Sequence, residues 1–277
     1  MSLLELECFI EEEKYQNLKH TNKEIQVIKG LIRNDLEYLE VKRKVWAEHG
    51  VVGKFTKVNR YQCDNQNLNE FLYNLGILPM VSFIDEKNLE EEEIYFLDEK
   101  ANIKTSRHVQ YYPNSLAYSK KSISIEDASI FSQMSTLQKV ECWKKMKRVN
   151  DVLSEQWINL MQDLTNSFES IETKKVRSKF GTFIFKENKL FCPKDVLKFM
   201  GERVLLRSCK TDLQKLEEYA ARGFLNLPEI NNYRRIIGAK VHFSLMELSK
   251  EEIVNAWLDK RQNRLSEISR NRFLPTD

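Results

Sequence analysis

The sequence predicts a mainly α-helical protein with a small α+β insert, and three observations lead to this fold class. The 277 residues include only 8 glycines and 5 prolines. These are less than half of the usual shares of about 7% and 5%, so turn-dense folds are disfavoured. Two segments carry apolar residues at helical spacing over many turns, and the chain after the first of them has strand-like runs. The predicted architecture has two long amphipathic helices, a β-hairpin and a C-terminal cluster of short helices.

The first long helix is predicted over residues 18–48. Apolar residues recur there every seven positions, at Leu18, Ile25, Ile32, Leu39 and Trp46. A second row widens this stripe, which is typical of a helix packed on other helices rather than of a two-stranded coiled coil. Gly50 is expected to end the helix as a left-handed cap. Residues 1–50 are thus predicted as an N-terminal helical domain, with self-association through helix 18–48 as the alternative use of the stripe.

Residues 51–130 are predicted as a small α+β region. Residues 55–63 are strand-like, and residues 94–97 are expected to pair with residues 103–112 as two further strands. The run Glu90–Glu93 is expected to form a solvated acidic loop. This region is predicted as a second domain.

The strongest periodic signal predicts one amphipathic helix over residues 137–171. Eleven apolar residues follow one another there at spacings of three or four, and a helix of this length spans about 50 Å. The first half of the helix carries a basic cluster outside the apolar stripe, composed of Lys139, Lys144, Lys145, Lys147 and Arg148. Such a cluster is either an ordinary solvated helix surface or a contact with an anionic partner, whose phosphates it would neutralise.

A β-hairpin is predicted near residues 180–192, with its turn around Asn188. Basic side chains lead into it, among them Lys174, Lys175 and Arg177. Its four phenylalanines are expected to be core residues, and a base-stacking platform is the alternative.

Three short helices are predicted between residues 193 and 238, a size that matches a helix-turn-helix unit. Helix starts along the chain are predicted from local signals: Asp64 or Asn65 as a cap, Pro193 and Pro228 at first positions, and capping boxes at Thr211/Gln214 and Ser249/Glu252. In a helix-turn-helix unit the third helix would expose Asn231, Asn232, Arg234 and Arg235. Arginine and asparagine hydrogen-bond base edges. Three small helices at a domain corner are the alternative, and residues 131–277 are predicted as one basic helical domain.

Charge is distributed unevenly along the chain. Residues 1–135 hold 17 Lys and Arg against 22 Asp and Glu, whereas residues 136–277 hold 27 against 19. A basic C-terminal half favours contact with nucleic acid. The predicted contacts are Lys144, Lys145, Lys147, Arg148, Lys174, Lys175, Arg177, Arg234 and Arg235.

The leading hypothesis is therefore a non-enzymatic binding or regulatory protein that contacts DNA or RNA through this half. The alternative is a protein–protein adaptor or inhibitor that uses the N-terminal helix or the acidic loop and no nucleic acid. Phosphate-binding glycine loops, nucleophile elbows and zinc-protease motifs are absent from the sequence. We expect no catalytic residues, no metal and no cofactor. A hidden enzyme is the third class, and it would need a pocket that gathers several of His108, His242, Glu187, Lys189 and the acidic residues of the α+β region.

The five cysteines are odd in number and far apart, which favours reduced thiols and a cytoplasmic location. The N-terminus has no basic leader, so a targeting peptide is not expected. No apolar run approaches the roughly 18 residues of a transmembrane helix, so no membrane partner is expected.

Overall fold

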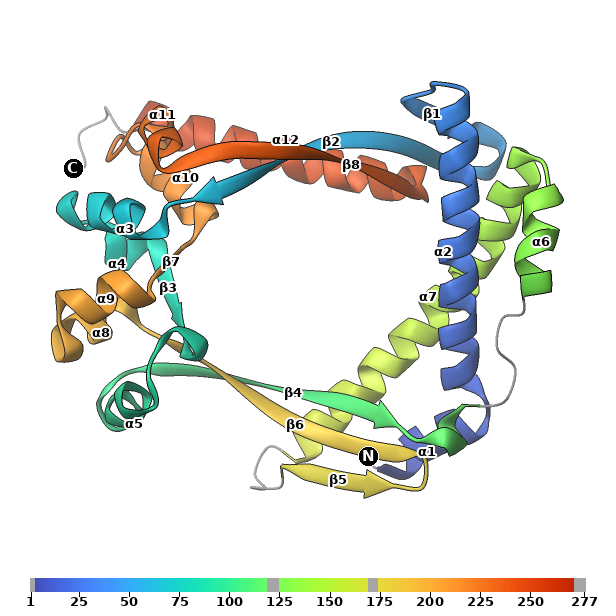
Figure 1. Ribbon diagram of the computed structural model, residues 1–277, viewed down its shortest axis with the longest axis horizontal. Helices are drawn as coiled ribbons and strands as arrows, with labels where there is room; N and C mark the ends of the chain where they lie inside the picture. The colour runs from blue at the N-terminus through green and yellow to red at the C-terminus, as the bar shows by residue number, and fades with distance from the viewer. Residues whose placement is uncertain (1–2, 119–124, 169–173, 272–277) are drawn as a thin grey trace. The chain divides into compact units, whose positions relative to one another are not determined.

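The computed structural model describes residues 3–118, 125–168 and 174–271, and its ribbon is drawn in Figure 1. It is 62% helical and 25% strand, with two antiparallel sheets of three and five strands. The fold is therefore α+β, and the predicted mainly α fold with a small insert is wrong. The error arises because three long strands carry polar side chains on both faces over part of their length, so they lack the clean alternation of a half-buried strand.

The chain divides into two compact units. The first unit contains Met1–Thr56, Arg107–Glu187 and His242–Glu251, and the second contains Lys57–Ser106, Asn188–Val241 and Glu252–Asp277. Four long strands contribute residues to both units: β2 (Val51–Cys63), β4 (Ile103–Pro113), β6 (Gly181–Phe191) and β8 (Arg234–Glu247). The domains predicted from sequence, with boundaries at residues 50 and 130, are consecutive segments and stay a prediction.

The first unit is organised around two long helices. Besides its parts of the four long strands, this unit contains α1 (Leu3–Glu11), α2 (Lys14–Tyr38), β1 (Arg43–Trp46), α6 (Ile125–Gln133), α7 (Thr136–Ser167) and β5 (Lys175–Ser178). The two long helices are α2 and α7. Helices α2 and α7 pack against each other through a core that includes Ile28, Ile32, Val140 and Trp143. Helix α7 confirms the periodic signal of residues 137–171 up to Ser167, and the prediction for residues 169–171 lies outside the described residues. Its start is fixed by a capping box between Ser135 and Gln138.

The first helix is shorter than predicted, because α2 ends at Tyr38. The following residues form a hairpin in which Arg43 lies opposite Lys54 and Trp46 opposite Val51. Gly50 does adopt a left-handed conformation, with φ 58°, but it lies in this hairpin rather than at the end of the long helix. The hairpin buries Trp46 and Val51 in the core of the first unit.

The hairpin predicted near residues 180–192 has its turn at a different position from the predicted one. Strand β6 runs without interruption through Asn188, and it pairs with β5, so that Ser178 lies opposite Gly181. The predicted turn at Asn188 is therefore wrong, and the turn lies at Lys179–Phe180. Gly181 has φ 151°, and a Cβ atom there would collide with the carbonyl oxygen of Tyr112, so this position requires glycine.

The second unit is a cluster of short helices around a short pair of strands. Its elements are α3 (Asn65–Asn74), α4 (Leu78–Val81), β3 (Ser82–Asp85), α5 (Glu91–Lys100), α8 (Pro193–Met200), α9 (Glu202–Ser208), β7 (Lys210–Thr211), α10 (Leu213–Ala221) and α11 (Leu227–Ile230), followed by most of α12 (Leu248–Asn271). Its core includes Leu72, Leu78, Ile84, Val196 and Leu205. Asp64 caps α3 and Pro193 opens α8, as predicted. The cap of α10 is Asp212 rather than Thr211.

Two segments of the second unit have a different secondary structure from the predicted one. The acidic run is not a loop, because Glu90 and Glu93 form a capping box and residues 94–97 continue as helix α5 rather than as a strand. The third helix of the predicted helix-turn-helix unit stops after a single turn at Asn231–Tyr233, and strand β8 starts at Arg234. Both segments were misassigned because short apolar runs fit a helix and a strand equally well.

The two halves of the chain have nearly the same order of elements, and α11 is the additional helix of the second half. Residues 3–113 follow the order α1-α2-β1-β2-α3-α4-β3-α5-β4, and residues 125–247 follow the order α6-α7-β5-β6-α8-α9-β7-α10-α11-β8. Hairpin β1–β2 pairs with β8 of the second half, and hairpin β5–β6 pairs with β4 of the first half. Each half is thus completed by a strand of the other.

The register of β3 and β7 supports this correspondence between the halves. Ser82 lies opposite Thr211 and Phe83 lies opposite Lys210. Ser82 and Lys210 are 128 residues apart, as are Phe83 and Thr211, so exchange of the two halves converts one pair into the other. The matching segments also share a pattern, Lys57-Val-Asn-Arg-Tyr-Gln-Cys63 in β2 and Lys186-Glu-Asn-Lys-Leu-Phe-Cys192, which begins in β6 and ends one residue after it. Helix α12 follows the second half as an additional long helix. None of the helices in the described ranges combines the length and the apolar character that crossing a membrane requires.

Candidate nucleic-acid interface

An exposed, basic pair of strands is the most distinctive surface of the second unit. We define the ribbon as residues 57–63 of β2 and 234–241 of β8, which are neighbours in the three-stranded sheet. All of these residues are exposed except Arg234, which is half-buried. The ribbon contains five cationic side chains and no carboxylate: Lys57, Arg60, Arg234, Arg235 and Lys240.

The two faces of the ribbon differ in composition. The guanidinium group of Arg235 donates from Nε and Nη2 to Oε1 of Gln62, at 3.1 and 2.8 Å, so these two side chains share a face. Alternation along a strand places Arg60 on the same face. The guanidinium of Arg234 lies 5.0 Å from the ring centroid of Tyr61 on the opposite face, and alternation adds Lys57 and Lys240 to it. Both faces are therefore positively charged.

The ribbon ends in a hollow that polar side chains line. This ribbon-end hollow has a volume of about 490 Å³ and includes Gln62, Asn65, Asn232, Arg234 and Arg235. Asp64 and Tyr233 also line the hollow, and they are joined by a backbone hydrogen bond in which Asp64 N donates to Tyr233 O at 2.8 Å. The two arginines therefore lie beside three side-chain amides, which is the combination of donors and acceptors that base edges require.

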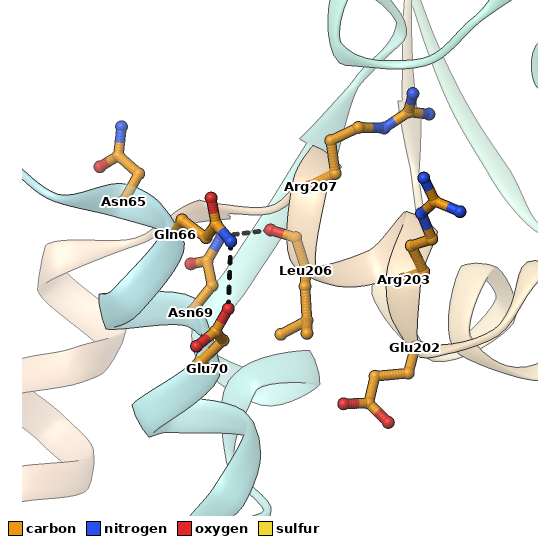
Figure 2. A pocket seen from close by; sticks show the side chains of 8 residues that line it. All are labelled: Asn65, Gln66, Asn69, Glu70, Glu202, Arg203, Leu206 and Arg207. Carbon is orange, nitrogen blue, oxygen red and sulfur yellow. Dashed lines mark hydrogen bonds between the residues drawn. The ribbon is translucent and has the colours of Figure 1, made fainter.

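A second hollow lies between α3 and α9, as Figure 2 shows. This α3–α9 hollow has a volume of about 700 Å³, and Asn65 lines both hollows. The buried amide of Asn69 donates to the carbonyl oxygens of Leu206 and Cys209, at 2.8 and 3.0 Å, and so ties the two helices together.

The two arginines on the α9 side of this hollow differ in their partners. Arg207 pairs with Glu90 and Glu93 of the capping box, which raises the pKa of its guanidinium group. Arg203 is exposed and has no ion pair or hydrogen bond within the described residues. Arg203 and Arg207 share the lining of this hollow with the carboxylates of Glu70 and Glu202, so the hollow holds charges of both signs.

The basic cluster predicted on α7 lies in the first unit and is largely paired. The ammonium group of Lys144 donates to the carbonyl oxygen of His49, and Lys145 lies 2.8 Å from Glu141. The hydrogen bond between Lys145 and Glu141 raises the pKa of the lysine and lowers that of the glutamate. Lys147 pairs with Asp151.

The remaining members of the predicted set are exposed. Arg148 has no ion pair among the side chains that the structure describes. Lys174, Lys175 and Arg177 are exposed at β5, which is the edge strand beside β6. Seven of the nine predicted contacts belong to the first unit, and Arg234 and Arg235 belong to the second.

Four exposed cations of the second unit, Lys57, Arg60, Lys240 and Arg203, were not predicted as contacts from the sequence. A usable signal was present, because residues 54–63 and 230–246 each contain several cations and no carboxylate. The alternation of polar and apolar residues that indicates a strand is interrupted in β8 by the adjacent residues Ile236 and Ile237. This apolar pair fitted the predicted third helix instead. The partner strand of β2 is also far away in sequence, so nothing local indicated that two basic segments meet.

Two of the four residues named for the hidden-enzyme hypothesis are engaged in separate pairs. Glu187 accepts a hydrogen bond from Arg107 in the first unit, and Lys189 pairs with Asp98 in the second. In the described ranges no three His, Cys, Asp or Glu side chains group closely enough to hold a metal ion.

Comparisons of the chain with protein-family models, with curated proteins and with solved structures found no match.

Proposed function

We propose that the protein is a non-enzymatic, cytoplasmic nucleic-acid-binding protein whose ribbon contacts duplex DNA. One observation carries this proposal: two adjacent exposed strands hold five cations and no carboxylate. An exposed ribbon without acidic side chains cannot neutralise its own charge, so it favours a polyanionic partner. The five cysteines, all of them free thiols, fit a reducing compartment.

The dimensions of a two-stranded ribbon favour DNA over double-stranded RNA. The major groove of B-DNA is wide enough to admit two antiparallel strands, whereas the major groove of A-form RNA is deep and too narrow for side chains to read. Arg60, Arg235 and Gln62 share one face of the ribbon, and such side chains form bidentate hydrogen bonds with guanine and adenine. Lys57 and Lys240 on the other face would contact phosphates, which position the protein without reading sequence.

Binding of fluorescently labelled duplex DNA to the whole protein tests the proposal. The double variant K57E/R60E reverses two ribbon charges. We expect it to lower the affinity about tenfold or more at about 50 mM salt, because released counterions dominate such binding. The slope of log affinity against log salt should also fall by about one for each phosphate that the variant no longer neutralises.

A matched variant separates the ribbon from net charge. K23E/K42E makes the same change of charge at two exposed residues of the first unit that have no ion pair within the described structure. We expect its affinity and salt slope to stay close to those of the unmodified protein. Equal losses in both double variants, or no loss in K57E/R60E, would contradict a ribbon interface.

The adaptor hypothesis ranks second because the apolar stripe of α2 and two of the four residues of the acidic run are engaged within the protein. The apolar stripe of α2 is buried against α7, where Ile28 and Ile32 have no exposed surface. The acidic residues Glu90 and Glu93 are paired with Arg207. Light scattering of the free protein would support the adaptor if a defined oligomer formed that ignores DNA.

A further inference from the structure

Helix α12 leaves several large apolar side chains exposed instead of packing them into the core of the second unit. From Glu252 onward no side chain described on this helix is buried, and Ile253 is 68% and Trp257 53% exposed. Helices at protein surfaces normally turn their apolar side chains inward. The exposed indole of Trp257 is therefore a group available to a partner outside the free protein.

Trp257 borders a small hollow between α10 and α12. The hollow has a volume of about 250 Å³, and α12 contributes Trp257, Lys260, Arg261 and Arg264 to it. Gln214 and Glu218 of α10 line the opposite side. This volume is below the roughly 300 to 1,000 Å³ of sites for drug-sized ligands, so it suits one planar group.

The charged side chains around the hollow are fixed by ion pairs. Arg261 pairs with Glu217 of α10, and its guanidinium group lies 5.7 Å from the ring centroid of Trp257. Arg264 lies 3.0 Å from Glu218. These pairs engage both glutamates, whereas Lys260 has no partner in the part of the chain that the structure describes. One uncompensated positive charge therefore lies beside an exposed aromatic ring.

We propose that this α10–α12 hollow binds an unpaired nucleotide of single-stranded nucleic acid. The base stacks on the indole of Trp257, and Lys260 neutralises the adjacent phosphate. Exposed aromatic side chains beside cations are the means by which proteins hold single strands, because every base presents a π face. Gln214 supplies amide donors and acceptors at the edge of the hollow. The inference rests on the proposed function only for the class of ligand, because the residues involved are separate from the ribbon.

Tryptophan fluorescence of the whole protein, titrated with the oligonucleotide dT10, tests this site. Trp46 and Trp143 are buried and Trp157 is half-buried, so quenching by a stacked thymine reports on Trp257. We expect dT10 to quench the unmodified protein and to leave the emission of W257F unchanged. W257A should bind labelled dT10 about tenfold more weakly, since stacking accounts for a large part of such affinity.

Two further variants make the result decisive. I253A removes an exposed apolar side chain of the same helix that does not line the hollow, and its affinity for dT10 should be unchanged. K57E/R60E should weaken duplex binding and keep the quenching by dT10, so failure of the ribbon is distinguishable from failure of this site. The inference is overturned if dT10 does not quench, or if W257A binds dT10 as tightly as I253A does.

Discussion

The ammonium group of Lys139 on α7 lies 2.9 Å from Oδ2 of Asp35 on α2, and the lysine side chain is only 6% exposed. The same carboxylate accepts a hydrogen bond from the hydroxyl of Thr136 at 2.8 Å. The pair therefore connects the two long helices of the first unit at the start of α7. A nearly buried charge is stable only while its partner is present.

This relationship predicts an asymmetric response to mutation. D35A leaves the buried ammonium group without a counter-charge and should lower the free energy of unfolding by about 3 kcal/mol. K139M should cost less, because Asp35 is 27% exposed and water can solvate its carboxylate. Urea denaturation of both variants measures the difference. Equal losses of stability in the two variants would contradict the predicted asymmetry and the role of the buried ammonium group in it.

The buried carboxylate of Glu251 predicts a pH dependence of stability. Hydrogen bonds from Arg43 and Lys54, both at 2.8 Å, hold the pKa of Glu251 below its usual value. A lowered pKa in the folded state means that the unfolded chain binds the proton more tightly. This contribution is present above the unfolded pKa of about 4.3 and is lost as the pH falls through the folded pKa.

The variant E251Q isolates this effect. It should be less stable than the unmodified protein at neutral pH, and the difference should shrink as the pH is lowered below about 4. Thermal unfolding of both proteins over this range provides the measurement. A difference that is independent of pH would assign the role of Glu251 to packing rather than charge.

Two glycines predict opposite effects of the same substitution. G181A introduces a Cβ atom that collides with a backbone oxygen, at a φ of 151°, so it should destabilise the protein by more than about 1 kcal/mol. G30A lies within α2, where nothing approaches within 4 Å, and it should stabilise by up to about 1 kcal/mol. Denaturant midpoints of the two variants test this, and a stabilising G181A would show that the turn can rearrange.

The ion pairs on α7 predict that its lysines contribute little to DNA affinity. Lys145 and Lys147 are paired with Glu141 and Asp151, so they neutralise fewer phosphates than free cations would. We expect K145A/K147A to change the affinity for duplex DNA by less than about twofold, in contrast to K57E/R60E. A reduction comparable to that of the ribbon variant would restore the α7 cluster as an interface.

Local signals predicted the elements whose stability is local. The three- and four-residue spacing predicted α7, and capping chemistry predicted the starts of α3 and α8, because these depend on neighbours in sequence. Arg234 and Arg235 were singled out from their residue types, but they were placed on a helix. Strand β8 forms instead because it pairs with β2, a strand from the other half of the chain.

By itself, the sequence determined a charged chain with long amphipathic helices and a basic C-terminal half. Only the tertiary structure decided that the chain has two halves of similar element order, each completed by a strand of the other. It also decided which cations remain free, because ion pairs such as that of Arg207 with Glu93 join residues far apart in sequence. Strand pairing and charge neutralisation are long-range properties, so they follow from which segments meet in space rather than from local composition.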